Sequence, residues 1–314
     1  MRVQLLTSLV LVAMLAGCIE NNSTSMGNTK DDDLLLPDWE VGDSWVYTFT
    51  TPQFGQDTAR LVVTEDDDGE GNYIVGISSE REAQRHAVIN HNPFLGRINH
   101  QTLGVYEQGE VQSVFSFPWR YDASWSFSLF GEEWTAEVVS IYDKEIRVEA
   151  TSTAGHAIKY TFSSTIEFVT SFEWMNEEGV PQLTMVVGEV KSDYIGDVFF
   201  YRARDLLDSH YQSNDQDVYD SFFDSGHPDG SEWDVLVWYI DAHISNGGQG
   251  SLAMKDRTGA SPLLRAWGSG ATEQGAIGTI PSNTGEYTLT IQLRGADSHL
   301  HFRVAGALSF QWTL

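Results

Sequence analysis

Three aspartates in the second half of the chain have the residue type and spacing of a cation site. Asp215, Asp217 and Asp220 lie close together in a stretch with little periodicity. Calcium takes about six to eight oxygen ligands and tolerates irregular loops, so these carboxylates are candidate calcium ligands. No other cofactor is expected. The alternative is a solvated acidic segment that binds no ion.

Two histidines near the end of the chain could begin a different metal site. His299 and His301 are two residues apart on an expected strand, so their rings share one face. Zinc needs more protein ligands than two, and no third ligand is adjacent in the sequence. Solvation at a sheet edge is the alternative. His86, His91 and His100 cluster in one segment, but nothing near them has the spacing of a nucleophile and its base.

Familiar catalytic motifs are absent from the sequence. No serine lies in Gly-x-Ser-x-Gly, and there is no phosphate-binding loop, dinucleotide fingerprint or His-Glu-x-x-His. The segment from Asp66 to Glu70 begins like an EF-hand loop, but Ile77 stands where the twelfth position requires a carboxylate. We therefore expect an Asp-rich hairpin turn there. Because the catalytic motifs are missing, we also expect a protein that is not an enzyme.

The single cysteine, Cys18, ends a short apolar run at the start of the chain. Arg2 precedes this run, and the small residues Ala16 and Gly17 close it. A basic start, a short apolar core and small residues before the cleavage point are typical of a secretory signal. The apolar core is too short to remain as a membrane-spanning helix.

The sequence Leu15-Ala16-Gly17-Cys18 resembles the lipobox of prokaryotic lipoproteins. The resemblance implies that residues 1–17 are a signal peptide and that Cys18 is acylated and becomes the new N-terminus. No thiol then remains for disulfides. Residues 18–36 are polar and acidic and are expected to form a flexible tether, so the protein would lie outside the cytoplasm on a membrane anchor. An ordinary secretory signal with a chance cysteine is the alternative.

The net charge of the protein limits the kinds of partner that it is expected to bind. The 314 residues include 45 acidic and 18 basic side chains, which gives a formal net charge of -27. Such a surface repels nucleic acid and anionic lipid headgroups and attracts cations. Nucleic acid is therefore not an expected partner, whereas the cell envelope and small amphiphilic ligands are.

Side chains alternate with a period of two over most of the chain, as they do in β-strands. In residues 44–51, Trp45, Tyr47 and Phe49 alternate with small polar residues. Residues 79–88 have an N-cap and a capping box and are the expected short helix. The sequence predicts an all-β protein: a long, curved, antiparallel sheet with at most one or two short helices, followed by a small jelly-roll-like β-sandwich.

Two segments of the first sheet repeat a pair of tryptophans six residues apart. These pairs are Trp39 with Trp45 and Trp119 with Trp125, and a proline precedes each. Paired indole rings could line a ligand groove, which makes these four the candidate ligand-binding residues. The alternative is structural, with each first tryptophan capping the open edge of a sheet layer, because aromatic residues in strands usually belong to the core.

We expect two folded parts. Residues 37–204 contain the element Trp39-Glu-Val-Gly-Asp-Ser-Trp-Val-Tyr47 and resemble envelope half-barrels of the lipoprotein-carrier type, whose concave face can hold acyl chains. Residues 231–314 contain Gly-x-Leu-x-Met-x-Asp-x-x-Gly followed by Gly-x-Tyr-x-Leu-x-Ile. They resemble the pre-peptidase C-terminal and CUB-like sandwiches of secreted proteins, which are mostly non-catalytic. Residues 205–230 are rich in aspartate and are expected to be a linker.

Three functions remain open. The first is a lipid-anchored, extracytoplasmic, non-enzymatic binding protein whose half-barrel holds an apolar or amphiphilic solute. The second is a structural or adhesive module of the cell envelope, in which the concave face is filled by the protein's own side chains. The third is an extracellular polymer hydrolase, whose two carboxylates would come from distant strands and leave no local motif. The sequence favours them in this order.

Overall fold

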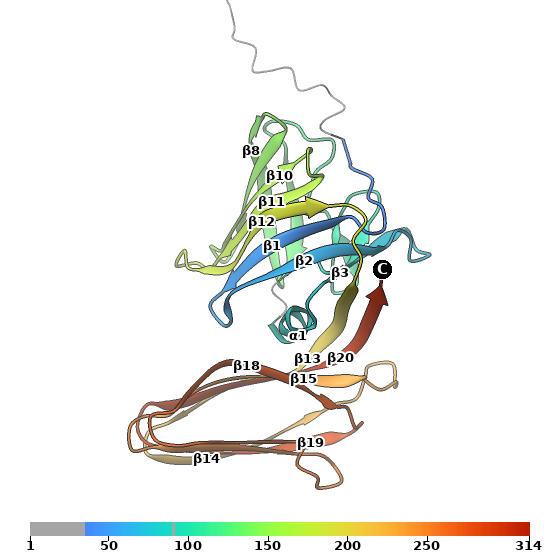
Figure 1. Cartoon of the computed structure of the whole chain (residues 1–314). Helices are drawn as coiled ribbons and strands as arrows, with labels where there is room; N and C mark the ends of the chain where they lie inside the picture. The colour runs from blue at the N-terminus through green and yellow to red at the C-terminus, as the bar shows by residue number, and fades with distance from the viewer. Residues whose placement is uncertain (1–34, 90–91) are drawn as a thin grey trace, which may run out of the picture.

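The structure, a computed structural model, describes residues 35–89 and 92–314 (Figure 1). The chain is nearly all β, with a large antiparallel sheet, a second, smaller sheet and one short helix in the described part, which confirms the predicted fold class. The lipobox, Cys18 and most of the predicted tether lie outside the described residues. No helix among the described residues has the length and apolar character needed to cross a membrane.

The first body is a curved antiparallel sheet. Its strands are β1 (Ser44–Thr51), β2 (Gly55–Glu65), β3 (Asn72–Ile77), β4 (Gly96–Asn99), β5 (Val105–Glu107), β6 (Glu110–Gln112), β7 (Ser124–Leu129), β8 (Glu132–Tyr142), β9 (Glu145–Ser152), β10 (Ala157–Ser163), β11 (Phe168–Met175) and β12 (Pro181–Lys191). They neighbour one another in the order β7-β8-β9-β10-β11-β12-β1-β2-β3, and β4, β5 and β6 extend in turn from β3.

The core of the first body lies against the concave face of this sheet. Phe94 precedes β4 and Phe115 follows β6, and both rings pack against this face. The ring centroid of Phe94 lies 5.2 Å from that of Phe168 on β11, and the ring of Phe115 lies 5.5 Å from that of Phe162 on β10. All four rings are buried. The concave face is therefore a packed aromatic core.

The second body is a β-sandwich. Its strands are β13 (Asp197–Ser213), β14 (Gln216–Asp224), β15 (Val235–His243), β16 (Gln249–Lys255), β17 (Leu263–Trp267), β18 (Thr272–Pro281), β19 (Glu286–Arg294) and β20 (Ser298–Thr313). One layer has the order β18-β15-β20-β13 and the other β14-β19-β16-β17. Buried side chains such as Ile240, Phe302 and Ile291 form the core of this body.

Two long strands, β13 and β20, join the bodies. They contain 17 and 16 residues, so each extends roughly 50 Å, and they pair along their whole length. Phe199 of β13 also pairs with Ile77 of β3, which makes the sheet of the first body continuous with one layer of the sandwich. Near the end of the chain, Trp312 donates a hydrogen bond of 2.8 Å from Nε1 to Glu65 of the first body.

The structure contradicts the linker predicted for residues 205–230. Most of this segment belongs to β13 and β14, and Tyr211 and Phe223 on these strands are buried in the sandwich core. The strands were hidden in the sequence because a β-bulge between Asp205 and Leu207 breaks the period of two. Their outward positions, moreover, carry mostly polar and charged residues. The sandwich therefore includes residues that precede 231.

The helix α1 (Glu80–Ile89) packs on the junction, on the face of β13, β15, β18 and β20 that points away from the sandwich core (Figure 1). It begins where the sequence predicted, because the backbone N–H of Glu82 donates to Ser79 Oγ at 3.3 Å. The carboxylate of Glu82 forms an ion pair with the buried Arg85, which also contacts Asp57 at 2.8 Å. These contacts fix the helix against the β1–β2 hairpin.

Candidate functional site

The first pair of predicted ligand-binding tryptophans belongs to the core. Trp39 and Trp45 are each 2% exposed, and their ring centroids lie 5.0 Å apart. Both indole N–H groups donate to backbone oxygens: Trp39 to Glu167 at 3.1 Å and Trp45 to Ile166 at 2.8 Å. Because neither face nor N–H group is free, the ligand-binding prediction is wrong for this pair.

The second pair behaves similarly. Trp119 is 2% exposed and packs on Phe162, with ring centroids 5.5 Å apart. Trp125 is half-buried, lies 6.2 Å from Trp119 and donates from Nε1 to the backbone oxygen of Ser113 at 2.8 Å. Trp119 therefore cannot contact a ligand, and Trp125 supports the core edge. The structural alternative explains both pairs.

The predicted calcium ligands do not converge. Asp217 and Asp220 are an odd number of residues apart on β14, so their side chains point to opposite faces. Asp217 accepts a hydrogen bond from the Asn214 N–H at 3.1 Å, and Asp220 accepts one from Thr290 at 2.9 Å. Asp215 lies in the turn before the strand. The calcium prediction is wrong because the segment is a regular strand, and not an irregular loop.

One histidine of the pair near the end of the chain lies beside two potential metal ligands from a distant part of the sequence. His301 on β20 is directly opposite His210 on β13, and Asp208 lies two residues before His210. In the described part of the chain, Asp208, His210 and His301 form the one group of three whose ligand atoms lie within 4.8 Å of one another. His299 is not a member. The Asp-x-His signal was present but lay in the segment taken as a linker.

Among the residues that the structure describes, the other histidine cluster does not form a site. His86 lies on α1, whereas His100 packs on Tyr73 with ring centroids 4.0 Å apart. His91 is outside the described residues.

A groove of about 750 Å³ lies where the first body meets β13, and nothing in the sequence predicted it. It is bordered by α1, by the β4–β5 segment and by one stretch of β13. Its lining combines apolar and charged side chains: His86, Ala87, Leu95, Arg97, Tyr106, Glu107, Gln108, Gly109, Phe200, Tyr201, Arg202, Ala203, Arg204 and Asp205.

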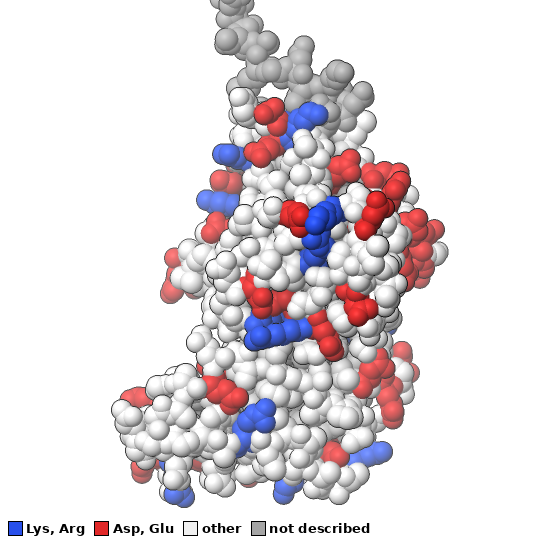
Figure 2. Space-filling view, in the orientation of Figure 1, with Lys and Arg blue, Asp and Glu red and all other residues white. Residues whose placement is uncertain are grey.

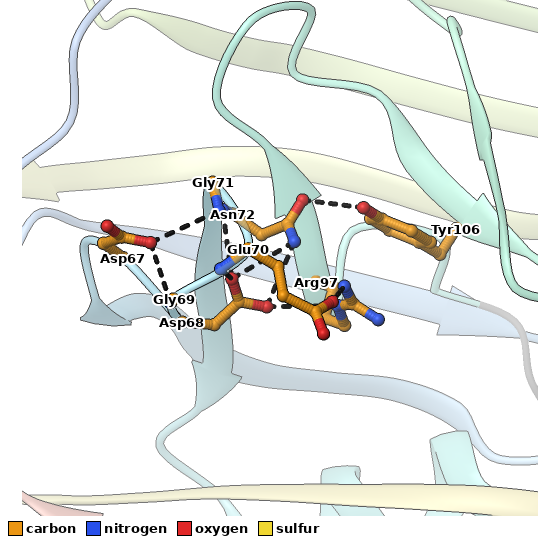
Figure 3. A network of polar contacts seen from close by, with 8 residues as sticks. All are labelled: Asp67, Asp68, Gly69, Glu70, Gly71, Asn72, Arg97 and Tyr106. Carbon is orange, nitrogen blue, oxygen red and sulfur yellow. Dashed lines mark hydrogen bonds and ion pairs between the residues drawn. The ribbon is translucent and has the colours of Figure 1, made fainter.

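One wall of the groove is held by the Asp-rich hairpin turn between β2 and β3 (Figure 3). Asp68 contacts Arg97 at 3.2 Å and accepts hydrogen bonds from Asn72, whose amide oxygen accepts one from Tyr106 at 2.7 Å. Although desolvation opposes ionisation, the Asn72 amide and the Arg97 guanidinium hold the pKa of Asp68 below its usual value. Glu70 also pairs with Arg97, so this arginine is neutralised.

The facing wall is β13. Gly96 has a φ of +93°, and a Cβ at this position would lie 2.6 Å from the Phe200 ring, so only glycine lets this ring pack against the start of β4. The guanidinium of Arg202 lies 5.9 Å from the centre of the Phe310 ring. Among the described residues neither Arg202 nor Arg204 has a carboxylate partner within ion-pair distance, and both are exposed.

The rest of the groove border, from α1 and the residues that follow it, carries no charge near neutral pH. His86 accepts a hydrogen bond at Nδ1 from the Asn92 N–H at 3.3 Å, which requires an unprotonated Nδ1. Desolvation by the surrounding packing lowers the pKa of His86 to about 4. Ala87 and Leu95 add buried apolar surface. The groove thus combines an apolar border with two unpaired arginines.

Unpaired arginines matter in a protein with 45 acidic and 18 basic residues. Figure 2 shows acidic and basic side chains spread over the visible face among uncharged surface, with no continuous basic patch. An isolated pair of guanidinium groups beside apolar surface favours a small anionic group over an extended polyanion.

Comparison with known proteins leaves the family open. No protein-family model and no curated protein matches the chain. Solved structures with some similarity include an exo-β-1,3-galactanase from Phanerochaete chrysosporium, with 8% identity, coverage of 84% of this chain and 69% of that chain, and a TM-score of 0.19. A family 43 arabinoxylan arabinofuranohydrolase from Bacillus subtilis has 9% identity, 83% and 79% coverage, and a TM-score of 0.20.

A third similar structure is MucB in complex with MucA(peri), at 8% identity, with coverage of 84% of this chain and 91% of that chain and a TM-score of 0.23. These similarities are too low to assign a specific function. Glycoside hydrolases occur among the similar structures, so the expectation of a protein that is not an enzyme is withdrawn, and a likeness this low assigns no activity in its place.

Proposed function

We propose that the protein is a lipid-anchored, extracytoplasmic protein that binds a small amphiphilic anion in the groove between α1, β4–β5 and β13. The observation that carries this proposal is the combination of apolar lining with the unpaired guanidinium groups of Arg202 and Arg204. The concave face of the first body, by contrast, is filled by buried aromatic side chains.

The chemistry of the groove suits both ends of such a ligand. An apolar tail would contact Leu95, Phe200 and Ala203, and each buried methylene contributes about 0.8 kcal/mol. A carboxylate or phosphate would pair with Arg202 or Arg204, whose planar guanidinium groups can bind two oxygens at once. Arg97 keeps its own carboxylate partners and acts as a fixed wall.

A fluorescent fatty acid with a dansyl group tests this proposal on the mature full-length chain. We expect saturable binding, with an affinity that falls at least tenfold in the double variant Arg202→Gln/Arg204→Gln. Ala203→Trp should block the groove sterically. Matched controls are Arg147→Gln and Val218→Trp, at exposed positions outside the groove. Unsaturable uptake, or equal loss in the controls, would contradict the proposal.

The membrane anchor is tested separately. The lipobox resemblance at Leu15-Ala16-Gly17-Cys18 supports acylation of the cysteine thiol. Labelled fatty acid should be incorporated into the wild-type protein and not into Cys18→Ser, and this variant should move from the membrane fraction to the soluble fraction. Unchanged membrane association of Cys18→Ser would contradict the proposed lipid anchor and would leave the groove proposal unaffected.

A structural or adhesive envelope module is the second candidate function. The observation that favours it is the filled concave face, with Phe94 and Phe115 packed against β10 and β11. This candidate predicts no saturable uptake of any amphiphile. It also predicts that cells without the protein have altered adhesion or envelope integrity. Cells with the double variant Arg202→Gln/Arg204→Gln should behave like wild type.

A further inference from the structure

A cluster of histidine and aspartate side chains lies on the sandwich layer that contains β13, β20 and β15. It is on the face that points away from the sandwich core, outside the groove. His210 and His301 are direct cross-strand neighbours, with ring centroids 3.7 Å apart and planes inclined by 19°. Asp208 shares this face, and its Oδ1 lies 2.7 Å from His301 Nε2. Three potential metal ligands thus come from two paired strands of regular geometry.

We propose that Asp208, His210 and His301 bind a divalent transition-metal ion, for which zinc is the probe. Imidazole nitrogen and carboxylate oxygen are the donors that zinc combines in sites with three protein ligands. Their ligand atoms already lie within 4.8 Å of one another. At metal–ligand distances of about 2 Å, a small rotation of each side chain would place the ion among them. A fourth coordination position would remain open to water.

Neighbouring side chains orient the proposed ligands. Arg303 Nε lies 3.3 Å from Asp208 Oδ2, which leaves Oδ1 directed toward His301. The same guanidinium contacts Asp205 at 3.3 Å, so its charge is shared between two carboxylates. An outer partner that holds a ligating carboxylate in place is a regular feature of metal sites, and the ion pair with Arg303 gives Asp208 such a partner.

The surroundings also favour a cation. Asp241 on β15 is directly opposite His301, which adds a further carboxylate to this face of the sheet. One step along the strands, His243 and His299 form another cross-strand pair, with ring centroids 5.3 Å apart. Four of the nine histidines of the chain therefore lie on one sheet face. An ion can reach the cluster because Asp208 and His210 are exposed.

The test uses the mature full-length chain, stripped with a chelator and titrated with zinc against a fluorescent zinc indicator. We expect one equivalent to bind at micromolar or lower concentration. His210→Gln and His301→Gln should each weaken binding at least tenfold. The matched controls His243→Gln and His299→Gln should change it less than threefold. Absence of stoichiometric binding, or equal losses in controls and ligand variants, would overturn the proposal.

A second measurement does not depend on how the variants fold. Cobalt added to the unmutated stripped protein should give visible d–d absorption bands that zinc abolishes at one equivalent. X-ray absorption of the zinc-loaded protein should show two imidazole ligands together with oxygen ligands. A first coordination shell of oxygen alone would place the ion elsewhere and would refute the site.

Discussion

The concave face of the first body and the outer face of the sandwich layer differ in what their strands present. On the concave face, the rings of Trp39, Trp45 and Phe168 pack against one another, with centroids 4.8–5.0 Å apart. On the outer face beyond α1, polar side chains such as Asp208 and His210 remain exposed. Both faces follow the same alternation of side chains along antiparallel strands.

The difference comes from what covers each sheet. The loops before β4 and after β6 carry Phe94 and Phe115 onto the concave face, so this face becomes a core. The outer sandwich face is covered only in part, by α1 and by Phe54, whose ring centroid lies 5.6 Å from that of Tyr239. Tryptophan pairs close together in the sequence therefore indicated packing, whereas the exposed polar cluster arose between strands that are far apart in the chain.

The largest expected effect concerns the strands that join the bodies. A fragment of residues 231–314 lacks β13 and β14, which pair with β20 and β19 and complete both layers. We expect this fragment to show no cooperative thermal unfolding by circular dichroism, and a fragment of residues 196–314 to recover it. Cooperative unfolding of the shorter fragment would show that the sandwich does not depend on the bridging strands.

Substitution in the closed face should be costly. Trp45→Ala removes a buried indole and its hydrogen bond to Ile166, and it should lower the free energy of unfolding by about 3–5 kcal/mol. The matched change Trp125→Ala, at a half-buried position, should cost about 1–2 kcal/mol. Chemical denaturation measures both. Equal losses in the free energy of unfolding would mean that the difference in burial between Trp45 and Trp125 does not affect stability.

Acid should weaken the contact of α1 with the first body. The pKa of His86 is lowered to about 4 in the folded protein, below its ordinary value of 6.5, so the unfolded chain takes up the proton first. Above pH 6.5 this difference has no effect on stability, and as the pH falls from 6.5 toward 4 it imposes a growing loss in the free energy of unfolding. It amounts to about 3 kcal/mol.

The measurement for His86 is the free energy of unfolding at pH 7 and at pH 4. His86→Gln carries no titratable group, and it should remove about 3 kcal/mol of this pH dependence. An identical pH dependence in wild type and His86→Gln would show that the imidazole is not protected by the fold.

The smallest effects are expected on β14. Asp220→Ala removes an exposed carboxylate and its hydrogen bond to Thr290, and it should change the free energy of unfolding by about 0.5 kcal/mol or less. Millimolar calcium should leave the melting temperature of wild type and of Asp217→Ala equally unchanged. A calcium-dependent rise that Asp217→Ala abolishes would restore this strand as a cation site.

The sequence by itself determined the features that depend on neighbours along the chain. The period of two predicted the strands outside residues 205–230. Ser79 and Glu82 marked the start of the helix, and the turn around Asp68 was correctly expected to be a hairpin. The tryptophan spacing was open to two interpretations, and burial decided for the structural one.

Only the tertiary structure decided which distant residues meet. The bulge after Asp205 places this residue and Asp208 on one face, and pairing of β13 with β20 sets His210 opposite His301. The groove likewise needs β13 to pass beside α1 and β4. Local periodicity specifies the face on which a side chain lies, but the register between strands far apart in the chain depends on how the whole core packs.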